Sequence, residues 1–221
     1  MPQINKSTLE FLADLKLHND REWFHANRKR YDEARHNFES YVQALIDELI
    51  TFEPILKGLE AGSCIYRINR DIRFSPDKTI YKTHMGAFIV RGGKRNGDKY
   101  AGYYFHVEPG NSLIAGGAYM PPAEWLSAIR EKIDNTGKEL NKIESRPDFA
   151  RYFGKIEGDK LKTAPKGYPK DHPNIEMLKF KSFLAEMSIP DKDIISNNSF
   201  EMIVSAFRAM KPLNDFLNAT F

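Results

Sequence analysis

Apolar residues recur at every third or fourth position through the first quarter of the chain. They are Tyr31, Ala34, Phe38, Tyr41, Leu45, Leu49 and Phe52. A one-sided stripe with this period predicts an amphipathic helix, here from about residue 19 to residue 52. Pro54 and Gly58 follow the stripe and predict its end.

Two capping-box patterns predict where the N-terminal helices begin. Ser7 with Glu10 predicts a short helix that begins at Ser7, and Asn19 with Glu22 predicts the start of the long one. We therefore expect an N-terminal helical segment over residues 7–57.

From residue 63 the chain turns to short runs of β-branched and aromatic residues, which predict strands. The segments between these runs are too short for crossover helices, so an antiparallel sheet is favoured. Gly116 and Gly117 are poor strand formers inside the last run, and they predict a bulge or a close approach of another part of the backbone. The four runs lie at residues 64–68, 86–91, 100–108 and 112–119.

Helical spacing returns after the paired prolines at 121 and 122. The order of helices, sheet and helices predicts an α+β fold in one domain over residues 1–221, with an antiparallel sheet of four or more strands in the middle. Its parts are the N-terminal helices at 7–57, the central sheet and basic loop at 63–120, and the C-terminal helices and loop at 121–221. Within the last part, helices are predicted at 122–133, 136–143, 148–154, 174–187 and 200–211, with a long loop at 158–173 and a short helix after Pro212.

The composition fits a folded protein, and the charge is unevenly placed. Hydrophobic residues make up 41% and aromatic residues 12% of the 221 residues, which excludes a disordered chain. The net charge is +3, yet residues 67–99 hold nine Lys/Arg against three Asp and carry +6, so the remainder carries −3. A local cationic patch predicts a partner that bears phosphate or carboxylate groups, unless salt bridges neutralise it.

Cys64 is the only cysteine, so no internal disulfide forms. It lies in an apolar run, which predicts a buried and unreactive thiol. A single thiol and an N-terminus without an apolar signal core predict a cytoplasmic protein. No stretch approaches the roughly 18 apolar residues of a membrane span, so no membrane is expected among the partners.

The candidate chemistry is concentrated between residues 67 and 82, a segment that we call the basic loop. Asp71 and Asp77 lie among its cations and are expected to orient the arginines. The two aspartates also suit a divalent metal, but they fall short of the about six oxygens that a hard cation takes, so no metal is predicted. Guanidinium and ammonium groups bind anions, so the predicted anion-binding residues are Arg67, Arg70, Arg73, Lys78 and Lys82.

Three residues are candidates for catalytic proton transfer. Tyr81 lies beside two lysines, and His106 and Glu108 share one face of the predicted third strand. If that face borders the basic loop, His106 acts as a base that Glu108 orients; if it faces solvent, the two are the polar half of an amphipathic strand. A second unusual stretch is either a lid over a bound anion or a rigid surface loop, and its residues are Lys166, Tyr168 and His172.

The basic loop resembles the signature of a known bacterial family. All eight residues of that signature occur here in the family's order, namely Arg67, Arg70, Asp71, Arg73, Phe74, Asp77, Lys78 and Tyr81. The family is a conserved domain of unknown function of roughly this chain's length. The resemblance implies one domain over the full length and brings no reaction, substrate or cofactor. Further similar stretches lie at residues 19–24, 102–106, 116–121, 165–167 and 210–213.

The sequence leaves three functions open. The first is a pocket for a phosphorylated or carboxylated small molecule, with or without catalysis and with an unknown cofactor. The second is a nucleic-acid-binding or protein-binding module that uses the basic patch at 67–99. The third is a salt-bridge network that only fixes the loop. The density of cations interleaved with Asp, Tyr and His favours the first.

Overall fold

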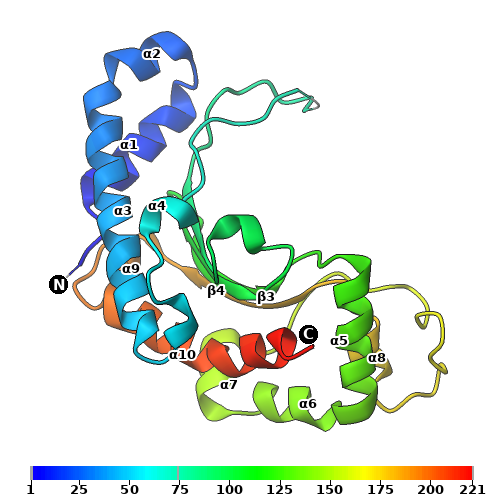
Figure 1. Cartoon of the computed structure of the whole chain (residues 1–221). Helices are drawn as coiled ribbons and strands as arrows, with labels where there is room; N and C mark the ends of the chain where they lie inside the picture. Colours follow the sequence, from blue (N-terminus) through cyan, green and yellow to red (C-terminus); the bar gives the residue numbers. More distant parts are fainter. Residues whose placement is uncertain (1, 74, 221) are drawn as a thin grey trace.

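A four-stranded antiparallel sheet forms the middle of the molecule (Figure 1). The computed structural model describes residues 2–73 and 75–220. In the register of the sheet, His106 lies opposite Gly86 on one side and Leu113 on the other. The predicted α+β fold with a central antiparallel sheet is confirmed. In their spatial order the strands are β1 (Met85–Ile89), β2 (Gly102–Val107), β3 (Ser112–Ala118) and β4 (Phe183–Ile189).

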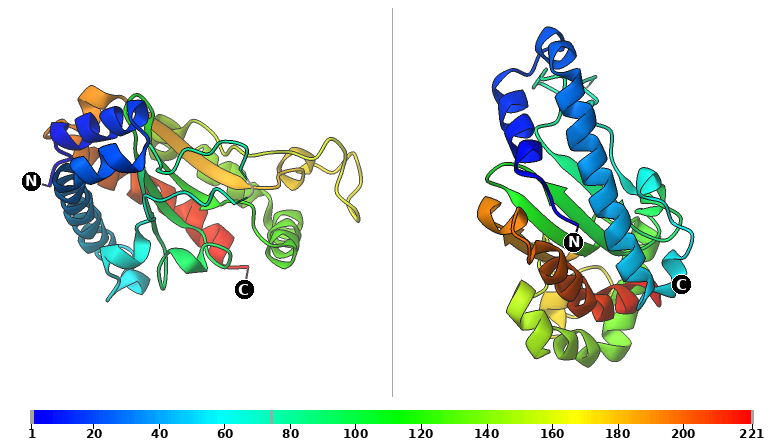
Figure 2. Two further views of the ribbon diagram at one scale, coloured as in Figure 1. Left: turned by 90° about the horizontal axis from the view of Figure 1, so that it is seen from above. Right: turned by 90° about the vertical axis from the view of Figure 1, so that its left-hand side faces the viewer.

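Helices from both ends of the chain cover one face of the sheet, namely α3 (Arg28–Ile50) and α10 (Ser199–Asn218) (Figure 2). Phe105 of β2 stacks on Phe38 of α3 with ring centroids 5.5 Å apart, and Tyr103 packs on Phe207 of α10 at 5.1 Å. Buried apolar side chains from both ends of the chain join this layer in one connected core. A single domain over residues 1–221 stays a prediction.

The opposite face of the sheet, which we call the open face, carries polar side chains. Side chains alternate along a strand, so Tyr104 and His106 point away from the core that Tyr103 and Phe105 join. On β4, Glu186 and Ser188 are exposed on this face. The open face is therefore the side of the sheet that is available for chemistry.

The N-terminal segment follows the prediction in outline but not in its caps. It consists of α1 (Lys6–Leu17), α2 (Arg21–Ala26), α3 and a 3-10 turn, η1 (Pro54–Leu56). Ser7 lies inside α1, and the Trp23 amide donates to Asp20 where the sequence predicts Asn19 as the cap. Both capping-box predictions are wrong, and the side chain of Asn19 binds elsewhere.

The predicted strand at 64–68 is wrong. The chain is helical in α4 (Ala61–Cys64), and Ile65 then makes one isolated bridge to Ala87 of β1. Ile65 and Ile68 are buried in the core and Tyr66 is exposed, and the described residues of this stretch form no strand ladder.

The predicted helix at 174–187 is also wrong over most of its length. It ends with α8 (Ile175–Leu178), and the chain then enters β4. Phe183 and Ala185 are buried whereas Glu186 and Ser188 are exposed, so the period of the pattern here is two. The spacing of apolar residues near 175–184 fits either period, and pairing with β3 decides between them.

The C-terminal helix α10 continues through Pro212, where the sequence predicts a stop. Proline removes one backbone donor inside a helix. Leu213, Phe216 and Leu217 beyond it are buried in the core, and this packing holds the last turns in place. Before β4 and α10 the chain forms the helices α5 (Ala123–Thr136), α6 (Lys138–Glu144) and α7 (Pro147–Phe153), and between β4 and α10 it forms α9 (Asp191–Ile194).

The two glycines inside β3 mark close approaches, as predicted. A Cβ on Gly116 would lie 2.2 Å from the Met210 sulfur of α10. Gly117 has a φ of +114°, and a Cβ there would lie 2.0 Å from the Phe183 carbonyl oxygen of β4. No helix in the described part of the chain is long and apolar enough to cross a bilayer.

Candidate functional site

The basic loop extends from the sheet towards α2, and its two legs pair near the base (Figure 1). The Arg70 amide donates to the Ile80 carbonyl at 2.9 Å, and the Lys82 amide donates to the Ile68 carbonyl at 2.8 Å. These backbone hydrogen bonds give the loop a defined base and a separate tip.

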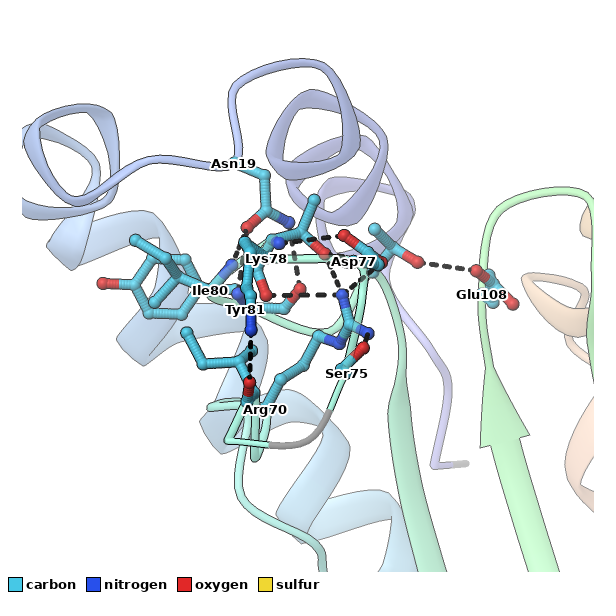
Figure 3. A network of polar contacts seen from close by, with 11 residues as sticks. Asn19, Arg70, Ser75, Asp77, Lys78, Ile80, Tyr81 and Glu108 are labelled. Carbon is cyan, nitrogen blue, oxygen red and sulfur yellow. Dashed lines mark hydrogen bonds and ion pairs between the residues drawn. The ribbon is translucent and has the colours of Figure 1, made fainter.

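Arg70 is bound by acceptors of its own loop. Its guanidinium donates to the Asp77 carboxylate and to the Thr79 hydroxyl, and it donates to the Ser75 hydroxyl at 3.4 Å (Figure 3). Hydrogen bonds from the Thr79 amide and from Arg70 lower the pKa of Asp77. The pair closes the tip of the loop on itself.

Arg73 and Lys78 are also occupied at the tip. Arg73 donates to the two carboxylate oxygens of Asp71 at 2.9 and 2.6 Å, and these hydrogen bonds lower the pKa of Asp71 to about 2. Lys78 Nζ donates to the Ile72 carbonyl at 3.1 Å. Phe74 of the signature lies outside the described residues. The tip thus neutralises most of its own charge.

Asn19 anchors the returning leg of the loop to the N-terminal helices. Its amide nitrogen donates to the Tyr81 carbonyl, and its oxygen accepts from the Ile80 and Tyr81 amides, each at 2.9 Å. The Tyr81 ring stacks on Phe24 at 4.1 Å and points away from Glu108 (Figure 3). Tyr81 therefore packs as a buried anchor, and its role in proton transfer stays a prediction.

Arg67 lies apart from the tip, at an open hollow of about 480 Å³ that we call the Arg67 hollow. Arg35 of α3 and Lys94 of the turn η2 (Lys94–Asn96) also line it. Three cations from three separate segments therefore share one concave surface. The full lining is Tyr31, Arg35, Ile65, Tyr66, Arg67, Ile68, Asn69 and Lys94.

The cations of the Arg67 hollow differ in how they are paired. Arg35 forms a 3.5 Å ion pair with Glu39, and Lys94 donates to the Ser63 carbonyl at 3.1 Å. Arg67 forms no hydrogen bond or ion pair with any residue that the structure describes. Its charge acts on Asp71, whose carboxylate is already bound twice by Arg73. Arg67 is thus available to an external anion.

Three residues along β2 and its end, Tyr104, His106 and Glu108, form what we call the polar row. The Tyr104 hydroxyl lies 2.9 Å from His106 Nδ1, and His106 Nε2 lies 3.2 Å from a Glu108 oxygen. Thr83 donates its hydroxyl to Glu108 at 2.7 Å, a contact drawn in Figure 3, and the His84 ring lies 4.4 Å from the His106 ring. Thr83 and His84 directly follow the basic loop, so this face does border it.

Burial dominates the electrostatics of the polar row. It lowers the pKa of His84 to about 4, with a further contribution from His106, and it lowers the pKa of His106 although Glu108 opposes the shift. Burial also raises the pKa of Tyr104 to about 12. Burial alone would raise the pKa of Glu108, but hydrogen bonds from Thr83 and other donors lower it overall. Burial thus favours the neutral form of the imidazoles of His84 and His106, whereas hydrogen bonds favour the ionised form of the Glu108 carboxylate.

Lys82 lies between the Arg67 hollow and the polar row. Its ammonium lies 5.3 Å from the centre of the Tyr66 ring, and Tyr66 lines the hollow. Burial and the charge of Arg67 lower the pKa of Lys82. The anion-binding residues predicted from the sequence thus separate into Arg67 and Lys82 near the sheet and Arg70, Arg73 and Lys78 at the closed tip.

The candidate lid, Lys166, Tyr168 and His172, lies beside α5 and α8 and away from the basic loop (Figure 1). His172 Nε2 lies 2.9 Å from a carboxylate oxygen of Asp134 on α5. Tyr168 packs against the core. The structure does not bring these residues to the basic loop.

Sequence reasoning missed three residues at these sites. Arg35 shows only the spacing to Glu39 of an ordinary helical ion pair, and His84 follows the signature without belonging to it. Asn19 matches a capping pattern that the chain does not use. The sequence around these positions does not indicate their role, because the residues that they contact at the site are distant in sequence.

Fold and site together define an α+β protein whose antiparallel sheet presents polar residues beside a basic, internally bonded loop. The chain belongs to the family of conserved hypothetical proteins DUF2461, whose family model matches residues 7–216. No curated protein and no solved structure matches the chain.

Proposed function

We propose that the Arg67 hollow binds a small molecule that carries a phosphate or carboxylate group. The observation that carries the proposal is that Arg67 forms no ion pair with any described residue and lies at a hollow that it shares with Arg35 and Lys94. A guanidinium binds planar or tetrahedral oxyanions through paired hydrogen bonds, and two neighbouring cations strengthen the attraction.

The surroundings of Arg67 suit a ligand that has a planar or apolar part in addition to its anionic group. Tyr31 and Tyr66 give the hollow aromatic surface for a planar or apolar part of the ligand. The polar row lies beyond Lys82, and proton transfer by His106 and Glu108 stays a prediction within this proposal. A cytoplasmic location belongs to it as well, and the free, buried Cys64 suits a reducing compartment.

The test is a titration of the full chain with inorganic phosphate, pyrophosphate and citrate at low salt, followed by calorimetry. Arg67→Ala is expected to weaken binding of the best of these about ten- to a hundredfold, since a charge-assisted hydrogen bond contributes about 1.5–3 kcal/mol. Arg95→Ala is the matched control, because Arg95 is exposed on η2 and does not line the hollow. It should change the affinity by no more than about two- to threefold, because surface substitutions usually change a free energy by less than about 0.5 kcal/mol.

Two results would refute the proposal. One is that none of the three anions binds. The other is that Arg95→Ala weakens binding as much as Arg67→Ala, which indicates a diffuse charge effect. A nucleic-acid-binding module predicts instead tight binding of a random oligonucleotide with a steep loss between 50 and 200 mM salt, on the order of a thousandfold for 6–10 phosphate contacts.

A further inference from the structure

Two histidines and a glutamate gather where the chain returns from the basic loop to the sheet. His84 lies just before β1, and His106 and Glu108 come from β2 and its end. Each offers one ligand atom, and these three atoms all lie within 4.8 Å of one another. The group is half-buried to buried, so its side chains have few alternative orientations.

The ligand types suit a transition metal. Zinc takes imidazole nitrogen and carboxylate oxygen at about 2.0–2.2 Å, so neighbouring ligands of a tetrahedral ion lie about 3.4 Å apart. His106 Nε2 and the Glu108 oxygen are 3.2 Å apart, which is already this spacing. The rings of His84 and His106 lie 4.4 Å apart, and the ligand atom of His84 lies within 4.8 Å of the other two, so a three-ligand set requires it to approach by at most about 1.4 Å.

The ligands are also held by a second layer of hydrogen bonds. Tyr104 binds the other nitrogen of His106 at 2.9 Å, and Thr83 binds the second oxygen of Glu108 at 2.7 Å. Outer partners of this kind fix the orientation of ligating histidines and carboxylates in metal sites. The regular alternation of β2 places His106 and Glu108 on one face at a fixed spacing.

We infer that His84, His106 and Glu108 bind a divalent transition-metal ion, for which zinc is the probe of choice. Three protein ligands leave at least one coordination position for water or a ligand on the open face of the sheet. The set of two imidazoles and one carboxylate disfavours the hard cations magnesium and calcium, which take oxygen ligands.

The inference goes beyond the proposed anion site and does not rest on it, because Arg67 is no ligand of the metal. It also gives His106 and Glu108 a different role from the base and orienting carboxylate that the sequence suggests. Asp71 and Asp77, the two residues whose sequence pattern suits a metal, are instead bound to arginines at the tip of the loop.

The experiment uses the full chain, freed of metal with a chelator and then titrated with zinc by calorimetry. Cobalt(II) serves as a second probe, because its visible absorption reports the ligand geometry directly. We expect one equivalent to bind, magnesium not to compete, and His84→Ala and Glu108→Gln each to weaken zinc binding at least about a hundredfold. Tyr104→Phe, which removes only an outer partner, should weaken it about tenfold.

His172→Ala is the matched control. His172 also lies beside a carboxylate, that of Asp134 at 2.9 Å, but at the other end of the molecule. It should leave zinc affinity and the cobalt spectrum unchanged. Circular dichroism checks the fold of each variant, and Tyr104→Phe keeps the test decisive if a ligand variant fails to fold.

Two outcomes would overturn the inference. The first is no saturable zinc binding by the wild-type chain, which leaves His106 and Glu108 as a hydrogen-bonded pair. The second is zinc binding that His172→Ala weakens as much as His84→Ala, which places it on scattered surface histidines. Loss of phosphate binding in Arg67→Ala with zinc binding intact would separate this inference from the proposed function.

Discussion

Replacing Asn19 by alanine tests whether a single side chain anchors the basic loop. The substitution removes three hydrogen bonds to the backbone at Ile80 and Tyr81, positions up to 62 residues further along the chain. Each contributes about 1 kcal/mol net, so the free energy of unfolding should fall by about 3 kcal/mol. For a chain of this length the melting temperature should fall by about 6–12 °C.

Asn19→Asp gives a graded comparison. It keeps the acceptor for the two amides and loses only the donor to the Tyr81 carbonyl, so its expected cost is at least about 1 kcal/mol and below that of alanine. Urea unfolding measures both costs. Hydrogen exchange at the Ile80 and Tyr81 amides measures the local effect, and protection from exchange should fall more at these two amides than in the rest of the chain.

The matched control is Asn27→Ala. The side-chain amide nitrogen of Asn27 donates to the Trp23 carbonyl at 3.0 Å, so the substitution acts within the helical region and not on the loop. Exchange at Ile80 and Tyr81 should be unchanged in this variant. If Asn19→Ala costs less than about 0.5 kcal/mol, the range of an ordinary surface change, or leaves those two amides protected, the anchoring role is refuted.

Two further predictions concern the sheet and the thiol. Gly117→Ala should abolish soluble expression, because its Cβ would lie 2.0 Å from the Phe183 carbonyl oxygen. The Cβ of Gly110→Ala meets nothing within 4 Å, so this variant should lose only about 1–2 kcal/mol of folding stability through left-handed backbone strain. Equal melting temperatures for the two variants would contradict this prediction. Burial raises the pKa of the Cys64 thiol, which leaves less thiolate at pH 8, so a disulfide reagent should react far more slowly with the native chain than with the chain in urea. Equal rates would show that the thiol is accessible.

The parts of the fold that could be predicted are those with a local and one-sided pattern. The stripe that ends at Leu49 and Phe52 predicts α3 because it is long enough to exclude a strand. The strand β4 could not be predicted, because a short apolar run satisfies either period and only its pairing with β3 selects the extended form. Pro212 misled for a related reason, since the packing of Leu213 outweighs one lost hydrogen bond.

The site could be predicted only in its residue types. The sequence indicates cations, interleaved aspartates and a His106–Glu108 pair on one strand face, and the structure brings that pair together at 3.2 Å. The sequence does not indicate which of the arginines form ion pairs with the aspartates. Arg70 and Arg73 are bound by Asp77 and Asp71 a few residues away. Arg67 lies at a hollow that is lined partly by segments distant in sequence, and the residues around Arg67 do not indicate which segments these are.

β4 is synthesised long after β3, with which it pairs, and this delay affects the nascent chain. β3 ends at Ala118, but the strand that pairs with it ends at Ile189. At about 5–20 residues per second, the intervening stretch takes on the order of 4–14 s to synthesise, and for that time the outer side of β3 is an unsatisfied sheet edge next to apolar surface. During translation the molecule is therefore exposed to aggregation at β3, the strand that contains Gly116 and Gly117.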